Sequence, residues 1–81
     1  MLVRTTWAES ARRHHVGRGS AKYVVRTAIP SVHLEPGRGP QLWWVGPDER
    51  GRMLEVMAVW QEELLLFVHV MPMALRERRS R

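Results

Sequence analysis

Cysteine is absent from this chain of 81 residues, which excludes disulfides and thiolate metal sites. Long hydrophobic runs are missing too, since the longest, residues 64–68, is far too short to span a bilayer. The N-terminal segment also lacks the apolar core of a signal peptide. The sequence therefore predicts a cytoplasmic protein without membrane association, built as one small domain over residues 1–81.

Acidic side chains are in the minority. Thirteen Lys and Arg stand against eight Asp and Glu, which gives a net charge of +5, and Lys22 is the only lysine. Arginine is the better bidentate phosphate ligand, so the excess favours RNA, DNA or an acidic protein as partner. A GC-rich genome encodes the same composition with no partner implied, and both interpretations stay open. The candidate nucleic-acid-binding residues lie near the outer faces of two expected helices and in the basic tail: Arg12, Arg13, Lys22, Arg26, Arg78 and Arg79.

Two helices are expected in the first third of the chain. Thr6 and Glu9 stand in capping-box spacing and predict a helix over residues 7–15. Ser20 is expected to cap a second helix over residues 20–28, which a proline then stops. The apolar stripe of the second helix is Ala21, Val24, Val25 and Ala28.

Short apolar runs separated by Pro- and Gly-rich turns follow, which is typical of strands. We expect strands over residues 31–34, 41–45, 52–60 and 64–70. The predicted fold class is α+β, with two N-terminal helices packed on a small antiparallel sheet of three to four strands. A short basic tail or helix over residues 73–81 is expected to close the chain.

One ionisable residue interrupts each of the last two apolar runs: Glu55 in the third and His69 in the fourth. If residues 61–63 form a three-residue loop, Trp60 faces Leu64 and Glu55 faces His69 across the hairpin. A loop one residue shorter puts Val70 opposite Glu55 instead. In the first register, the face of Glu55 also holds Met53, Met57, Val59, Leu65 and Phe67.

Both faces of this hairpin are largely apolar, which is typical of an interior position in a sheet. One face is expected to receive the two helices. The other needs a cover, supplied by the C-terminal tail, by a second subunit in a homodimer through the apolar sheet face, or by a partner protein.

The Glu55–His69 pair has two interpretations. It is either a partly buried structural ion pair or an acid–base pair, because a neighbouring carboxylate fixes the tautomer of an imidazole that titrates near neutral pH. In RNA cleavage a base deprotonates the 2′-hydroxyl, and arginine stabilises the charge that develops on phosphate. The candidate catalytic residues are His69, Glu55, Arg52 and Arg76.

Metal and cofactor sites are not expected. His14 and His15 are adjacent on the predicted helix and point apart, whereas metal ligands on a helix favour i and i+4. The sequence holds neither a His-Glu-x-x-His element nor a Gly-rich phosphate loop.

In the Trp43-Trp44 pair, one ring is expected in the core and one at a rim, where it offers a surface for base stacking.

Three segments of the chain have the order found in a known family: SARRHHV at residues 10–16, WVGPDERGRMLEV at 44–56 and HVMPMALR at 69–76. The pattern resembles small bacterial toxins of the BrnT type, related in fold to RelE-like mRNA interferases. The resemblance implies two helices before a small antiparallel sheet, RNA cleavage without a metal, and neutralisation by a cognate antitoxin. In it, Arg52 matches the basic residue after the hairpin turn and Arg76 lies near the arginine after the last strand.

Two main functions follow from the sequence. The first is a toxin-like component of a bacterial type II toxin–antitoxin pair that acts as a metal-independent ribonuclease. The alternative is a non-enzymatic module of the same fold that binds nucleic acid or protein. A structural accessory protein without catalysis is a third option.

Overall fold

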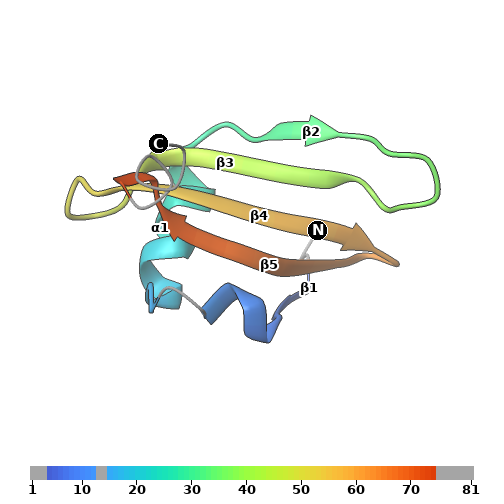
Figure 1. The fold of residues 1–81 in the computed structure, drawn as a ribbon, viewed down its shortest axis with the longest axis horizontal. Helices are drawn as coiled ribbons and strands as arrows, with labels where there is room; N and C mark the ends of the chain where they lie inside the picture. The colour runs from blue at the N-terminus through green and yellow to red at the C-terminus, as the bar shows by residue number, and fades with distance from the viewer. Residues whose placement is uncertain (1–3, 13–14, 75–81) are drawn as a thin grey trace.

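The computed structural model describes residues 4–12 and 15–74, and in it five strands form one mixed sheet in the order β1-β5-β4-β3-β2 (Figure 1). Strand β1 runs parallel to β5, and every other neighbouring pair is antiparallel. The elements in chain order are β1 (Arg4–Trp7), the 3₁₀ helix η1 (Glu9–Arg12), α1 (Arg18–Thr27), β2 (Ser31–His33), β3 (Gln41–Pro47), β4 (Met53–Gln61) and β5 (Leu64–Pro72).

The predicted fold class is wrong in its helices and in its sheet. Two helices on three to four antiparallel strands were expected, but the described residues form one α-helix, one 3₁₀ turn and a five-stranded mixed sheet. The predicted basic tail or helix lies mostly outside the described residues, which end at Ala74.

The predicted α-helix over residues 7–15 is wrong. Of these residues, Trp7 ends strand β1, Glu9–Arg12 form only the 3₁₀ helix η1, and residues 13–14 lie outside the described part of the chain. The capping residue Thr6 lies inside β1, in register with β5. β-branched and aromatic side chains favour a strand when an edge is available for pairing. Here β5 provides that edge, and the Trp7 ring stacks on Phe67 with centroids 4.5 Å apart.

Helix α1 begins earlier than the expected residue 20, with Gly17 at its N-cap. Ser20 therefore lies inside the helix rather than capping it, and its hydroxyl donates a 2.6 Å hydrogen bond to the Glu49 carboxylate in the β3–β4 turn. Buried Ala21 and Val24 face the sheet. Gly46 of β3 lets the helix approach closely, because a Cβ at Gly46 would lie 3.2 Å from that of Ala28.

The β4–β5 hairpin differs from the expected register. Its turn has two residues, Glu62 and Glu63, both with positive φ, and it pairs Gln61 with Leu64. A β-bulge then adds Val68 to β5, so that Ala58 faces Phe67 while Met57 faces His69.

Because side chains alternate along a strand, the bulge changes which β5 residues share a face. Leu65 and Phe67 were expected beside Glu55, but they lie on its opposite face, with Leu54, Val56 and Ala58. We call this second face the proximal face. Helix α1 packs on it over β3 and β4, and η1 packs on it over β5 (Figure 1). The buried core of the proximal face comprises Ala11, Ala21, Val24, Trp44, Leu54, Val56, Ala58, Leu65, Phe67 and Val70.

The other face, which we call the distal face, lies away from α1 and η1. It carries His33, Trp43, Val45, Met53, Glu55, Met57, Val59, Leu66, His69 and Met71.

No helix in the described part of the chain has the length and hydropathy of a membrane span.

Candidate active site on the distal face

Glu55 and His69 meet on the distal face. Glu55 faces Met71 on β5, not His69 as the simple hairpin predicted, and His69 lies diagonally across the ladder. A long side chain reaches such a diagonal neighbour. The His69 Nε2 atom lies 3.0 Å from Glu55 Oε1, so the expected pairing is made through a different register.

The bulge at Val68 is what brings the two residues to one face. With a two-residue turn and no bulge, the ladder would pair Val56 with His69 and direct the imidazole into the proximal core. Two bonds from the N-terminal segment hold the bulge: Ser10 Oγ donates to the Val68 carbonyl at 2.6 Å, and the Ala8 N–H donates to the Phe67 carbonyl at 2.9 Å. The η1 segment therefore positions the site from the other side of the sheet.

The environment of the pair is asymmetric. Glu55 is only 5% exposed, whereas the side chain of His69 keeps 28% of its surface. A carboxylate oxygen accepts, so in the tautomer that carries its hydrogen on Nε2 the imidazole donates to Glu55 Oε1. A buried carboxylate that orients a more exposed imidazole is the arrangement of a general acid–base pair and its orienting group.

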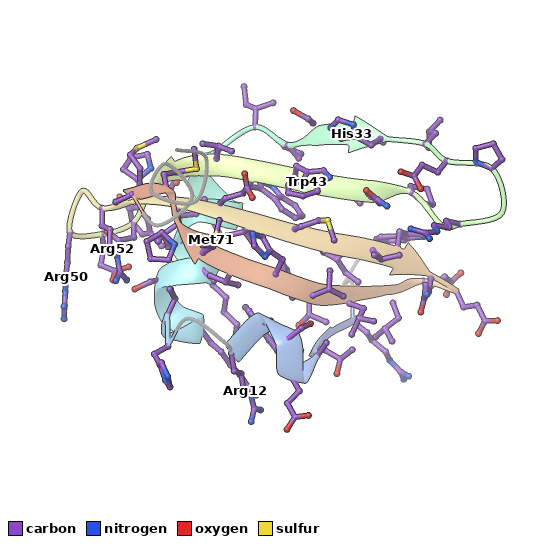
Figure 2. The ribbon with its side chains drawn as sticks, in the orientation of Figure 1. Arg12, His33, Trp43, Arg50, Arg52 and Met71 are labelled. Carbon is purple, nitrogen blue, oxygen red and sulfur yellow. The ribbon has the colours of Figure 1, made fainter. Side chains whose placement is uncertain are left out.

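Aromatic and imidazole rings continue the site across the sheet. Trp43 lies between His69 on one side and His33 on the other, with ring centroids 6.2 Å apart in each case. Figure 2 shows Trp43 and His33 on neighbouring strands, β3 and β2. Neither ring belongs to the predicted catalytic set, although Trp43 was one of two tryptophans considered for base stacking.

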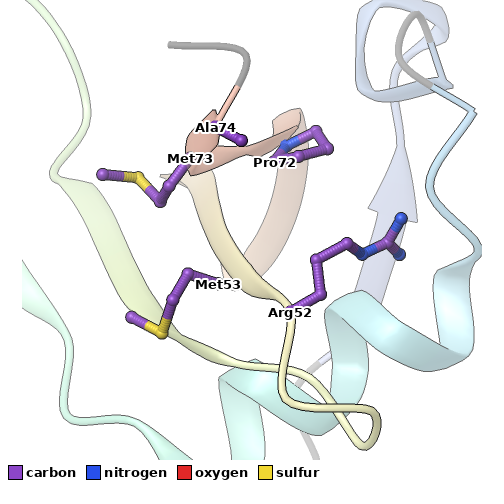
Figure 3. A pocket seen from close by; sticks show the side chains of 5 residues that line it. All are labelled: Arg52, Met53, Pro72, Met73 and Ala74. Carbon is purple, nitrogen blue, oxygen red and sulfur yellow. The ribbon is translucent and has the colours of Figure 1, made fainter. Parts of the chain in front are cut away.

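Arg52 does not join this group. Its Nε donates a 3.1 Å hydrogen bond to Asp48 in the β3–β4 turn, and Figure 3 shows its side chain directed away from that of Met53, which belongs to the distal face. Arg52 immediately precedes β4, and continuing the alternation of that strand places it on the side of α1, opposite Glu55. The other predicted phosphate ligand, Arg76, lies outside the described residues.

Asp48 explains why Arg52 is held in the turn. Its buried carboxylate accepts the backbone N–H groups of Arg50 and Arg52, each at 2.9 Å, as well as the Arg52 guanidinium. Burial by itself raises the pKa of this carboxyl, but the backbone donors of Arg52 and Arg50 and the Arg52 side chain outweigh it. The pKa of Asp48 therefore lies below its ordinary value. Arg52 is first of all a structural partner of this turn.

An open pocket of about 470 Å³ lies where β4 begins and β5 ends (Figure 3). Its lining is Arg52, Met53, Pro72, Met73 and Ala74. Among the described lining residues only Arg52 is ionisable, so those residues supply no acid–base pair, and the candidate chemistry stays with Glu55 and His69.

The predicted nucleic-acid-binding residues that the structure describes are Arg12, Lys22 and Arg26, and all three are exposed on the side of the helices. Arg13, Arg78 and Arg79 lie outside the described residues. Arg18 is not in the predicted binding set, although it too was expected near an outer helix face. Arg18, Lys22 and Arg26 stand four residues apart and share one side of α1. We call these three residues the cationic stripe.

No three His, Cys, Asp or Glu side chains within residues 4–12 and 15–74 are grouped to hold a metal ion. The chain matches no protein-family model, and neither a curated protein nor a solved structure is similar to it.

Proposed function

We propose that this protein is the toxin-like component of a bacterial toxin–antitoxin pair and that it cleaves RNA through His69 and Glu55. The observation that carries the proposal is the 3.0 Å contact between His69 Nε2 and the buried Glu55 carboxylate. The family resemblance of residues 44–56 and 69–76 adds support.

In the proposed reaction, His69 takes the proton of a ribose 2′-hydroxyl, and the 2′-oxygen attacks the neighbouring phosphorus. The bond from phosphorus to the 5′-oxygen breaks, and the protonated imidazole returns a proton to that oxygen. The products are a 2′,3′-cyclic phosphate and a 5′-hydroxyl end. Glu55 acts by holding the imidazole in one tautomer and one orientation. Because His69 supplies both proton transfers, the mechanism requires no metal.

The direct test is cleavage of RNA by the purified protein in the presence of a chelator, with analysis of the product ends. His69→Ala should lower the rate by roughly 10²–10⁴-fold, the usual contribution of general acid–base catalysis. Glu55→Gln keeps the shape of the side chain and should cause a smaller loss. Glu35→Gln, an exposed glutamate in the β2–β3 loop, is the matched control and should cleave as the wild type does.

The wild type and His69→Ala can also be compared in cells, through growth arrest on expression. The wild type should stop growth and His69→Ala should relieve the arrest, provided that circular dichroism shows both to be folded. A harmless wild type whose purified form leaves RNA intact would refute the proposal. Equal cleavage by the wild type and a folded His69→Ala variant would refute the role of the pair.

A cognate antitoxin is the expected partner of such a toxin. The distal face exposes apolar surface beside the pair, with Val45 and Met53 each nearly half exposed. A bound antitoxin covering these residues would block RNA from His69. Co-expression with the product of the neighbouring gene should then restore growth and protect Val45 and Met53 in a cross-linking or exchange experiment.

A second candidate function, nucleic-acid binding without catalysis, is favoured by the cationic stripe. Its three side chains lie on the side of the sheet opposite Glu55, so a strand bound at His69 would reach them only around an edge of the sheet. Binding through the stripe should weaken with salt, and each phosphate contact contributes roughly one unit of log–log slope. Lys22→Gln should reduce that slope by about one, whereas Arg38→Gln, in the β2–β3 loop, should not.

A further inference from the structure

The geometry points to a nucleobase subsite at Trp43, where one unpaired base of a single-stranded RNA stacks on the indole next to the Glu55–His69 pair. This inference rests on the proposed function, because it names the part of the substrate that the same site holds. It adds a binding residue that neither the resemblance nor the acid–base pair supplies.

The two adjacent tryptophans have different fates. Trp44 is 4% exposed and packs on Phe67 in the proximal core, with ring centroids 6.0 Å apart. Trp43 points to the distal face and is half-buried. Trp44 is thus accounted for by packing, while Trp43 keeps part of its indole surface available on the face that carries His69.

The ring contacts of Trp43 are not stacked. Its planes make angles of 75° with His33 and 54° with His69. By contrast, Trp7 and Phe67 stack at 18° with centroids 4.5 Å apart. Among the rings that the structure describes, none lies parallel on the Trp43 indole, and the two imidazoles instead flank it on β2 and β5.

A nucleobase is the ligand class that fits this arrangement. Flat sheets with exposed aromatic rings bind single-stranded RNA by stacking, and every base offers a π-face to such a ring. The bases of an A-form duplex are stacked on each other and cannot reach the indole. A base on Trp43 brings its ribose toward the neighbouring His69, which is where the proposed reaction needs the 2′-hydroxyl. Binding at this position should be tolerant of base identity.

The test is binding of an uncleavable single-stranded oligonucleotide, 2′-O-methylated throughout, so that affinity is measured without turnover. Trp43→Phe and Trp43→Leu are the informative pair, since both fill the half-buried site but only phenylalanine stacks. Loss of one base–aromatic stack weakens binding by roughly 5- to 150-fold, so Trp43→Leu should fall within that range. Trp43→Phe should stay near the wild type. Val32→Ala changes an exposed apolar residue of β2 that does not lie on the distal face; it is the control and should bind as the wild type does.

The outcomes separate this inference from the proposed function. If Trp43→Leu binds within twofold of the wild type while RNA cleavage by the wild type is confirmed, the subsite is wrong and the enzyme proposal stands. If the wild type cleaves nothing but binding depends on an aromatic ring at position 43, the subsite stands and catalysis fails. Equal binding of the matching duplex by the wild type and Trp43→Leu is expected. A duplex affinity that also requires the ring overturns the single-strand assignment.

Discussion

Both faces of the sheet carry many apolar side chains, but the two faces differ in their polar residues and in their burial. On the proximal face Leu54, Val56, Ala58 and Val70 are almost fully buried beneath α1 and η1. The distal face, formed by the alternate residues of the same strands, carries a glutamate, two histidines and a half-buried tryptophan. Among the described residues, the buried side chains of the proximal face pack against the helices, whereas Glu55 and His69 of the distal face form a polar contact.

The comparison also shows that the faces depend on each other. Ser10 belongs to η1 on the side of the core, yet its hydroxyl holds the carbonyl of Val68, the bulge residue that directs His69 to the distal face. The site is therefore a property of the N-terminal segment and the last hairpin together. Substitutions on the proximal face should therefore change mainly the stability, and substitutions on the distal face mainly the chemistry.

The largest effect is expected from Phe67→Ala on the proximal face. Phe67 is 2% exposed and contacts both Trp7 and Trp44, so its removal leaves a cavity and should destabilise the protein by about 3–5 kcal/mol. Denaturant unfolding measures the loss. Leu66→Ala, at the next position but on the distal face, should cost less than half as much, and equal losses would contradict the division between the faces.

The next effect concerns the buried pair itself. Glu55→Ala and His69→Ala should each destabilise the protein by about 1–3 kcal/mol, because each leaves a polar group without the other. A double-mutant cycle should show a coupling free energy of about 0.5–3 kcal/mol. Additive losses would mean that the contact contributes nothing, and the positioning role of Glu55 would then lose its basis.

Asp48 gives a pH-dependent prediction for the turn that retains Arg52. A carboxyl whose pKa is lower in the folded than in the unfolded chain stabilises the fold above its unfolded pKa of about 3.9. That stabilisation is lost as the pH falls through the folded pKa. The stability difference between the wild type and Asp48→Asn should be constant near neutral pH and shrink below about pH 4. Asp48→Ala, which also removes the acceptor for two backbone N–H groups, should be less stable than Asp48→Asn at every pH.

Ser10→Ala is expected to have the smallest effect on stability. It is also the most direct test of the link between the two faces. Loss of this exposed hydrogen bond should cost up to about 1 kcal/mol. Amide exchange at the bulge and RNA cleavage should both respond, because the bulge orients His69. Thr27→Ala removes a comparable bond, from Thr27 Oγ1 to the Tyr23 carbonyl within α1, and should leave both readouts unchanged. Identical behaviour of the two variants would show that η1 does not position the site.

Much of the local structure follows from the sequence because its cause is local. The alternating apolar runs indicated strands that correspond to β3, β4 and β5, and the stripe of Ala21, Val24, Val25 and Ala28 indicated a helix where α1 lies. The turn residues between β3 and β4 were also readable, since Asp48 and Gly51 have short-range roles. The N-terminal strand could not be predicted, because Thr6 and Glu9 also satisfy a helix-capping pattern. Pairing with β5, far along the chain, decides between helix and strand.

The candidate site divides in the same way. The sequence by itself determined that a carboxylate and an imidazole interrupt two neighbouring apolar strands, and polar groups in such positions need a partner. Only the tertiary structure decided that they meet. A two-residue turn and one extra residue in β5 together set the face of His69, and a shift of one residue moves a side chain to the other side of a sheet. The position of Arg52 was likewise decided by its contact with the Asp48 carboxylate. No spacing rule in the sequence distinguishes an arginine held in this way from a free surface arginine.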